Sequence, residues 1–167
     1  TLGTPLLVHG GVIYTTLAKE TVNDFQAYIK TREQGLEKLR SGNTFLWVDR
    51  DPERLKQVRQ ESVLVQPFQE NPVVPVFDGL IHDWIGAAFL PGATLKRTLA
   101  LVQDYNNHKV IYQPEVVDSK LVNRTGDVFK IFLKLKKKKV LTVILNTEHE
   151  AQYHHLSTTR VWSKSFS

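Results

Sequence analysis

Residues 128–139 read VFKIFLKLKKKK, and this alternating run is the clearest structural signal in the chain. Four apolar side chains stand at alternate positions, 129, 131, 133 and 135, and Lys130, Phe132 and Lys134 stand between them. Successive side chains of a β-strand point to opposite faces of the sheet, so this spacing predicts a strand with one apolar face and one solvated face. The apolar face must therefore be covered by something else.

The surrounding sequence predicts that this strand belongs to an antiparallel meander. Alternating or apolar runs predict strands at 116–122, 128–135, 140–153 and 159–166. Turn residues at 123–127, the lysines at 136–139 and residues 154–158 separate these strands. Before the meander, a strand is predicted at 80–90 and is ended by Pro91 and Gly92. A helix is predicted at 95–105, but about 17 Å of helix is too short to cover four or five strands.

The first half of the chain has helical spacing instead. Apolar positions predict a helix over 21–39, with Thr21 as its N-cap and Gly42 ending it. Asp51 and Pro52 are typical of a helix start and predict a second, short helix. Three prolines predict an irregular connector at 66–79. We therefore expect an N-terminal helical extension with its connector at 1–78 and a main domain at 79–167.

Composition limits the possible functions. The 167 residues carry a net charge of +5 and 41% hydrophobic residues, which is typical of one folded chain. The chain has no cysteine, which excludes disulfides, thiolate metal sites and cysteine nucleophiles. No stretch reaches the roughly 20 apolar residues of a membrane helix. Residues 1–18 are uncharged and have two interpretations: an ordinary N-terminal strand or loop, or the end of a secretory signal. The second would mean export to the periplasm or outside, and a cytoplasmic location is the alternative.

Several short motifs resemble the START-like or SRPBCC superfamily, and within it a bacterial branch without an assigned function. These motifs are HDWIG at 82–86, FLPG at 89–92, QDYNNH at 103–108, YQPEV at 112–116, KKKV at 137–140 and NTEHE at 146–150. The resemblance implies an α+β helix-grip fold, in which a curved antiparallel sheet with a helix after its first strand grips a long C-terminal helix. It also implies a ligand cavity between sheet and helix. This sequence stops at Ser167 within a predicted strand, so we expect the final strands and the long helix to be missing.

The resemblance places the predicted ligand-binding residues on the apolar face and among the large aromatics. Plain core packing is the alternative for the aliphatic residues, and packing with one hydrogen bond each is the alternative for the aromatic ones. The predicted ligand-binding residues are Trp84, Tyr112, Phe129, Ile131, Leu133, Val143, Leu145, His149 and Trp162.

The densest titratable group is Glu148, His149 and Glu150, followed by His154 and His155. On a strand His149 points away from both glutamates, so the three side chains do not converge on a metal ion. We therefore predict no metal site, no cofactor and no catalytic residue.

The lysines at 136–139 have two interpretations. A solvated hairpin turn that protects the sheet edge is preferred. The alternative is contact of Lys136, Lys137, Lys138 and Lys139 with an anionic membrane surface. Binding of nucleic acid is not expected, because Phe129 and Phe132 lie on opposite faces and form no stacking platform.

The sequence thus predicts a non-catalytic domain that binds a lipid or another apolar small molecule. Two alternatives stay open. One is an enzyme of the cyclase or dehydratase kind that uses the same cavity, with His149 as its polar group. The other is a basic interaction module without a small-molecule ligand.

Overall fold

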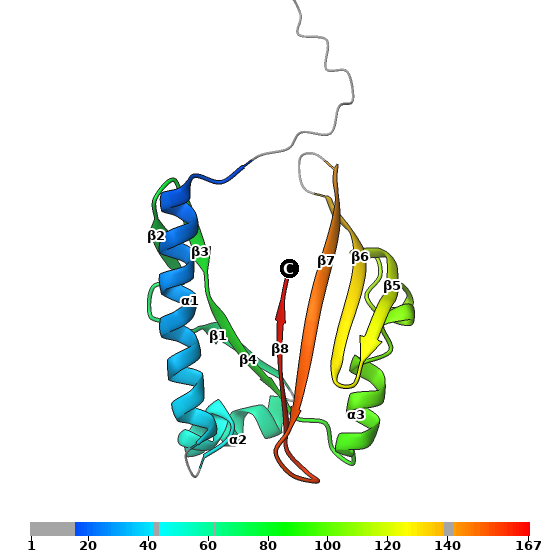
Figure 1. Cartoon of the computed structure of the whole chain (residues 1–167). Coiled ribbons are helices and arrows are strands. Elements are labelled where there is room, and N and C mark those ends of the chain that lie inside the picture. Colours follow the sequence, from blue (N-terminus) through cyan, green and yellow to red (C-terminus); the bar gives the residue numbers. More distant parts are fainter. Residues whose placement is uncertain (1–15, 42–43, 62, 139–141) are drawn as a thin grey trace, which may run out of the picture. The chain divides into compact units, whose positions relative to one another are not determined.

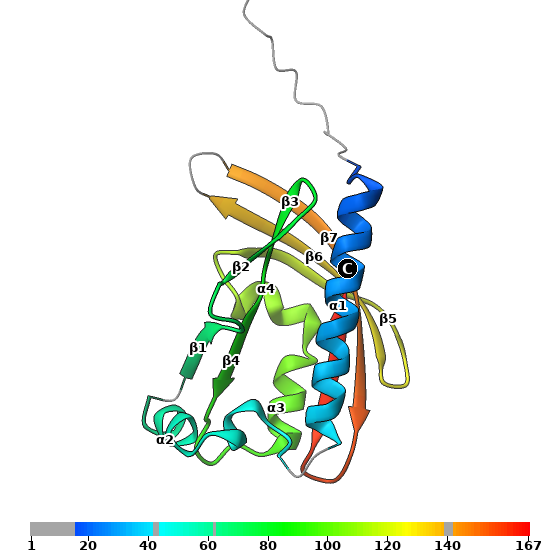
Figure 2. The same cartoon turned by 90° about the vertical axis from the view of Figure 1, so that its left-hand side faces the viewer.

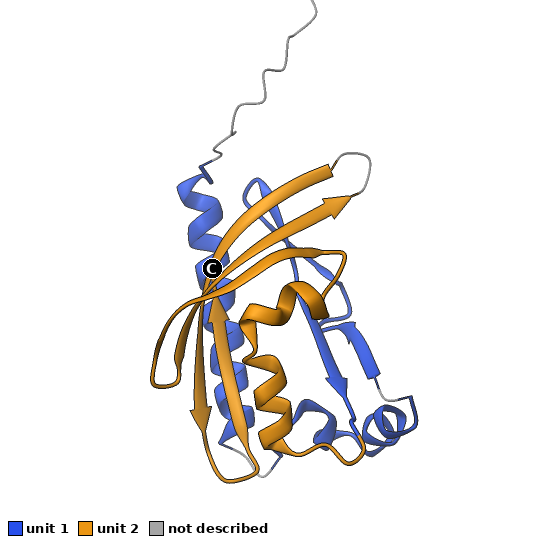
Figure 3. Ribbon diagram, turned by 90° about the vertical axis from the view of Figure 1, so that its right-hand side faces the viewer, with its two compact units in different colours: residues 1–90 blue, residues 91–167 orange. Residues whose placement is uncertain are grey.

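The protein has an α+β fold with several antiparallel sheets, here described from a computed structural model (Figure 1). The structure describes residues 16–41, 44–61, 63–138 and 142–167. The chain divides into two compact units, Thr1–Leu90 and Pro91–Ser167 (Figure 3). No helix in the described part of the chain is long and apolar enough to cross a membrane.

The first unit combines two helices with two short β-ribbons. Strand β1 pairs with β4 and β2 pairs with β3, both antiparallel. The elements are α1 (Lys19–Arg40), a 3-10 turn (Trp47–Arg50), α2 (Pro52–Glu61), β1 (Val63–Pro67), β2 (Val73–Val76), β3 (Gly79–His82) and β4 (Trp84–Ala88).

Asp83, between β3 and β4, ties α1 to the ribbons. Its Oδ2 accepts hydrogen bonds from the Tyr28 hydroxyl at 2.6 Å and from Arg32 Nε at 2.5 Å. The Arg32 guanidinium also lies 3.2 Å from the centre of the Phe68 ring. Only 16% of each side chain of the Arg32–Asp83 ion pair is exposed, so water weakens this pair little.

Several expectations for this unit are corrected by the structure. Thr21 is not the N-cap of α1: the helix begins after Ala18, and Thr21 is buried and donates to the Phe77 carbonyl at 2.8 Å. Gly42 lies outside the described residues. The single strand predicted at 80–90 is two strands, because Asp83 turns its side chain to α1 between them.

The connector predicted at 66–79 contains β2, in which Pro75 stands opposite Leu80 of β3. A hairpin edge tolerates this proline, because among the described residues only β2 and β3 form this sheet and no further strand needs the missing N–H. The predicted boundary at 78/79 lies in the turn of this hairpin. Along the chain, the first compact unit ends at Leu90 and the second begins at Pro91. The short helix predicted at Asp51 and Pro52 is confirmed as α2, with Asp51 Oδ1 accepting from the main-chain N–H groups of Glu53 and Arg54.

The second unit begins with helices and continues as the predicted antiparallel meander. Figure 2 shows α3 and α4 following each other along the chain, and Figure 3 shows the sheet bending around them. The strand order is β5-β6-β7-β8. The elements are α3 (Leu95–Val102), a 3-10 turn (Tyr105–Asn107), α4 (His108–Ile111), β5 (Val116–Thr125), β6 (Val128–Lys138), β7 (Thr142–His155) and β8 (Val161–Phe166).

Strands β6 and β7 extend farther than predicted, into two segments that the sequence assigns to turns. Lys136, Lys137 and Lys138 belong to β6 and stand opposite Ile144, Val143 and Thr142, so they do not form the turn itself. Lys139 lies outside the described residues. His154 and His155 belong to β7 and pair with β8, because cross-strand hydrogen bonds extend to Val161.

The two faces of β6 are as different as its alternation predicts. Phe129 and Ile131 are only 1% and 4% exposed, whereas Lys130 between them is exposed. We call the face that carries Phe129 the inner face and the face that carries Lys130 the outer face. Leu99 and Val102 of α3 pack against the buried residues of the inner face.

We expect Phe129→Ala to lower the free energy of unfolding by about 3–5 kcal/mol, because it leaves a cavity in the most deeply buried part of this unit. Phe166→Ala is the matched control, since Phe166 lies on the same sheet but is 51% exposed, and it should cost less than about 1 kcal/mol. Urea unfolding followed by far-UV circular dichroism measures both. Equal losses would contradict the assignment of the core.

We expect Asp83→Ala to cost about 2 kcal/mol, because it leaves the part-buried Arg32 and the Tyr28 hydroxyl without their acceptor. Lys56→Gln removes an exposed ion pair with Glu53 and should cost less than about 0.5 kcal/mol. Thermal unfolding of the two variants tests this difference. A loss for Asp83→Ala no larger than for Lys56→Gln would show that α1 is held by other contacts.

Candidate functional site

The inner face of the second unit is divided into a packed part and an uncovered part. The packed part is centred on Phe129, which contacts the rings of Tyr105 and Tyr153 at centroid distances of 5.5 and 5.3 Å. The hydroxyls of these two tyrosines are 2.6 Å apart. The guanidinium of Arg124 lies 4.5 Å from the centre of the Phe129 ring. These groups fill the space beside Phe129, so a ligand cannot occupy it.

Farther along β6 and β7, apolar side chains on the same face are much more exposed. Leu135 stands opposite Leu145, and Lys137 stands opposite Val143. Leu145 and Val143 are 43% and 47% exposed, and Leu135 is partly exposed. We call Leu135, Val143 and Leu145 the distal strip. Leu133 lies between the strip and the core and packs against the core.

His149 lies on the inner face between the core and the distal strip, opposite Ile131. Its Nε2 is 2.8 Å from the Thr147 hydroxyl oxygen, which stands on the same face toward the strip. The glutamates on either side of His149 point to the outer face, as the sequence predicts. Within the described ranges, no group of three or more His, Cys, Asp or Glu side chains is placed to hold a metal ion.

The structure brings together six of the nine predicted ligand-binding residues and separates the others. Trp162 stands opposite His154 on the outer face, where the two rings stack at 4.0 Å. Trp84 belongs to β4 in the first unit and is 55% exposed. Tyr112, at the end of α4, makes an edge contact with the His108 ring at 5.1 Å. The residues that share the inner face of β6 and β7 are Phe129, Ile131, Leu133, Val143, Leu145 and His149.

A groove of about 370 Å³ opens beside the end of β8, and the sequence analysis did not predict it. Lys130, Glu150 and Phe166 stand side by side across three strands on the outer face and line it. Two of the predicted ligand-binding residues, Ile131 and His149, also contribute to its lining. Glu150 accepts a hydrogen bond from Gln152 at 2.9 Å. Pairing across three strands joins residues far apart in the chain, so no local pattern could reveal this groove.

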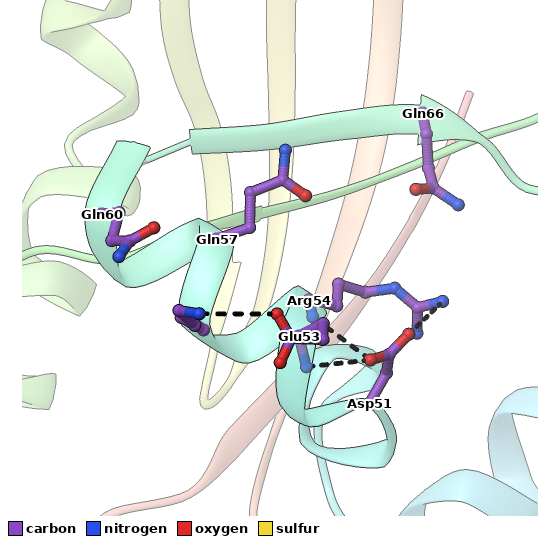
Figure 4. Close-up of a pocket in the computed structure, with 7 residues that line it drawn as sticks. Asp51, Glu53, Arg54, Gln57, Gln60 and Gln66 are labelled. Carbon is purple, nitrogen blue, oxygen red and sulfur yellow. Dashed lines mark hydrogen bonds and ion pairs between the residues drawn. The ribbon is translucent and has the colours of Figure 1, made fainter.

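A second pocket, of about 430 Å³, lies in the first unit along α2 (Figure 4). Its charged side chains are engaged with each other: Arg54 pairs with Asp51 at 3.4 Å, and Lys56 pairs with Glu53 at 3.7 Å. Asp51 also caps the helix. These interactions account for the polar lining as helix capping and surface pairing, and they do not favour a ligand there.

Two groups of the second unit have a shifted pKa. Burial, and then the hydrogen bond to Tyr153, raise the pKa of Tyr105, which packs against Phe129, well above its usual range. Asp118 stands opposite Lys134, and its pKa is lowered by hydrogen bonds from the Lys109 ammonium group and from the Ser119 N–H. Neither Tyr105 nor Asp118 is paired with His149 in the sheet. Burial and the hydrogen bonds named above account for both pKa shifts.

The raised pKa of Tyr105 predicts a loss of stability in alkali. The native state favours the neutral phenol, so its contribution is complete below the ordinary tyrosine pKa near 10 and declines as the pH rises above it. Free energies of unfolding measured between about pH 8 and pH 11 should fall, and less steeply in Tyr105→Phe than in the unmodified chain. The same slope in both proteins would contradict burial of this hydroxyl.

Comparisons with known proteins find no match. No protein-family model, no curated protein and no solved structure matches the chain.

Proposed function

We propose that this protein binds an apolar small molecule or a lipid chain along the distal strip, without catalysing a reaction. The observation that carries the proposal is that half-exposed aliphatic side chains continue the packed core on the same sheet face. Burying such side chains is favourable by about 25 cal/mol per Å² of apolar surface. A ligand that covers the strip would therefore extend the hydrophobic core.

The arrangement also supplies a polar contact for one end of a ligand. Thr147 and His149 follow Leu145 on the inner face, between the strip and the packed core. Apolar sites commonly fix a ligand's orientation with a few polar groups of this kind. The Thr147 hydroxyl donates to the Leu133 carbonyl at 3.2 Å, so it accepts its second hydrogen bond from His149 Nε2. This nitrogen is then a donor and not a base, which supports a headgroup contact.

The proposal also includes the START-like fold and the export that the sequence analysis predicts. We interpret the bent sheet with α3 on its inner face as the START-like, helix-grip arrangement, because α3 follows the predicted order and packs against the core. The uncharged stretch at residues 1–18 adds export from the cytoplasm to the proposal.

A dye-binding experiment tests the proposed function by substituting two adjacent residues whose side chains lie on opposite faces of the sheet. The neutral probe Nile red is titrated into the chain, and oleic acid is then added to displace it. Leu145→Glu places a charge on the strip, beside Lys137, and should weaken binding at least tenfold, because an apolar ligand that covers the strip would have to desolvate the carboxylate. Ile144→Glu is the matched control, since Ile144 is 47% exposed but faces the outer side, and it should change the affinity less than twofold.

Equal weakening by the two glutamates would contradict a site on the inner face. Absence of any saturable dye binding by the unmodified chain would contradict the function itself. Circular dichroism spectra of both variants must match that of the unmodified chain, which separates loss of binding from loss of folding.

A further inference from the structure

The outer face of the same hairpin carries a different set of side chains. Lys134, Lys136 and Lys138 follow each other along this face of β6. At about 3.3 Å per residue, neighbouring lysines in this row stand roughly 7 Å apart. Ile144 of β7 stands directly opposite Lys136 and is 47% exposed. We call these four residues the basic face.

Positive charge dominates this part of the molecule. Residues 91–167 contain 13 Lys and Arg against 6 Asp and Glu, and residues 128–147 contain no acid at all. Asp118, which stands opposite Lys134, is paired with Lys109 at 3.1 Å. Glu115 adjoins Lys136, whose N–H donates to the Glu115 carbonyl at 2.7 Å. Glu148 is the next residue after Asn146 on the outer face of β7 and lies beyond the basic face, opposite Phe132. Lysine therefore predominates on the basic face itself.

We propose that the basic face binds an anionic lipid surface, with the lysines at the phosphate level and Ile144 inserted among the lipids. Each lysine close to such a surface contributes an attraction that salt screens. The exposed isoleucine among the lysines gains from contact with lipid and would gain nothing from contact with free phosphate. This proposal uses the outer face and does not depend on the ligand site of the inner face.

The same residues fit nucleic acid less well. Proteins that bind single strands stack bases on aromatic side chains between basic residues. On the described hairpin end, residues 133–138 and 142–147, no side chain is aromatic. The nearest aromatic on the outer face is Phe132, which is partly exposed and stands opposite the acidic Glu148, so it does not lie between lysines as a stacking platform would. An aliphatic side chain at the centre of the basic face therefore favours a lipid surface.

Flotation with vesicles tests the proposal on the full chain. Binding to phosphatidylcholine vesicles that contain phosphatidylserine should exceed binding to pure phosphatidylcholine, and should weaken as salt rises from about 0.1 M to about 0.5 M. Changing Lys134, Lys136 and Lys138 together to Gln should weaken binding to anionic vesicles about 100-fold. The matched control changes Lys30, Lys38 and Lys56 of the first unit to Gln, removing the same charge, and should have an effect below threefold.

Ile144→Ser separates insertion from charge attraction. It leaves every lysine in place and should weaken vesicle binding about tenfold, while Nile red binding stays unchanged. Loss of vesicle binding in the control triple variant equal to that in the basic-face variant would overturn the proposal, as would no effect of Ile144→Ser. Tighter binding to a single-stranded oligonucleotide than to anionic vesicles, lost in the same lysine variant, would assign the face to nucleic acid instead.

Discussion

The alternation of apolar and basic side chains along β6 is the constraint on which the second unit depends. A strand with Phe129 and Ile131 on one face and Lys130 on the other is stable only if the first face is covered and the second is solvated. Helix α3 and the turn that carries Tyr105 cover the part of the strand near Phe129. The far end of β6 keeps the same alternation, but the aliphatic side chains there are about half exposed, so one strand carries both a structural core and an exposed apolar strip.

The two proposed activities follow from this single strand because its register separates them. Paired residues of β6 and β7 share a face, so Leu135 and Leu145 meet on the inner side while Lys136 and Ile144 meet on the outer side. A one-residue shift of this pairing would exchange the two sets. The proposed apolar ligand and the proposed lipid surface would thus lie on opposite sides of one hairpin.

The sequence predicted the elements that local patterns control. Period-two spacing located the four strands of the meander, and Asp51 with Pro52 located the start of α2. Longer-range contacts were not predictable. Thr21 has the residue type of an N-cap, but its hydroxyl donates to the Phe77 carbonyl instead. Asp83 interrupts the apolar run at 80–90 and accepts hydrogen bonds from Tyr28 and Arg32 of α1. For the candidate site, spacing correctly placed six residues on one face, but the pairing of His154 with Trp162 and the Tyr105–Tyr153 hydroxyl contact depend on tertiary structure.

Methyl NMR spectroscopy with oleic acid tests most directly whether the inner face is divided into a packed and an open part. We expect the methyl signals of Val143, Leu145 and Leu135 to shift with saturable dependence on oleic acid, while those of Ile131 in the core and Ile144 on the outer face stay in place. Shifts of Ile144 equal to those of Leu145, or no shift at any of the strip methyls, would contradict this division of the inner face.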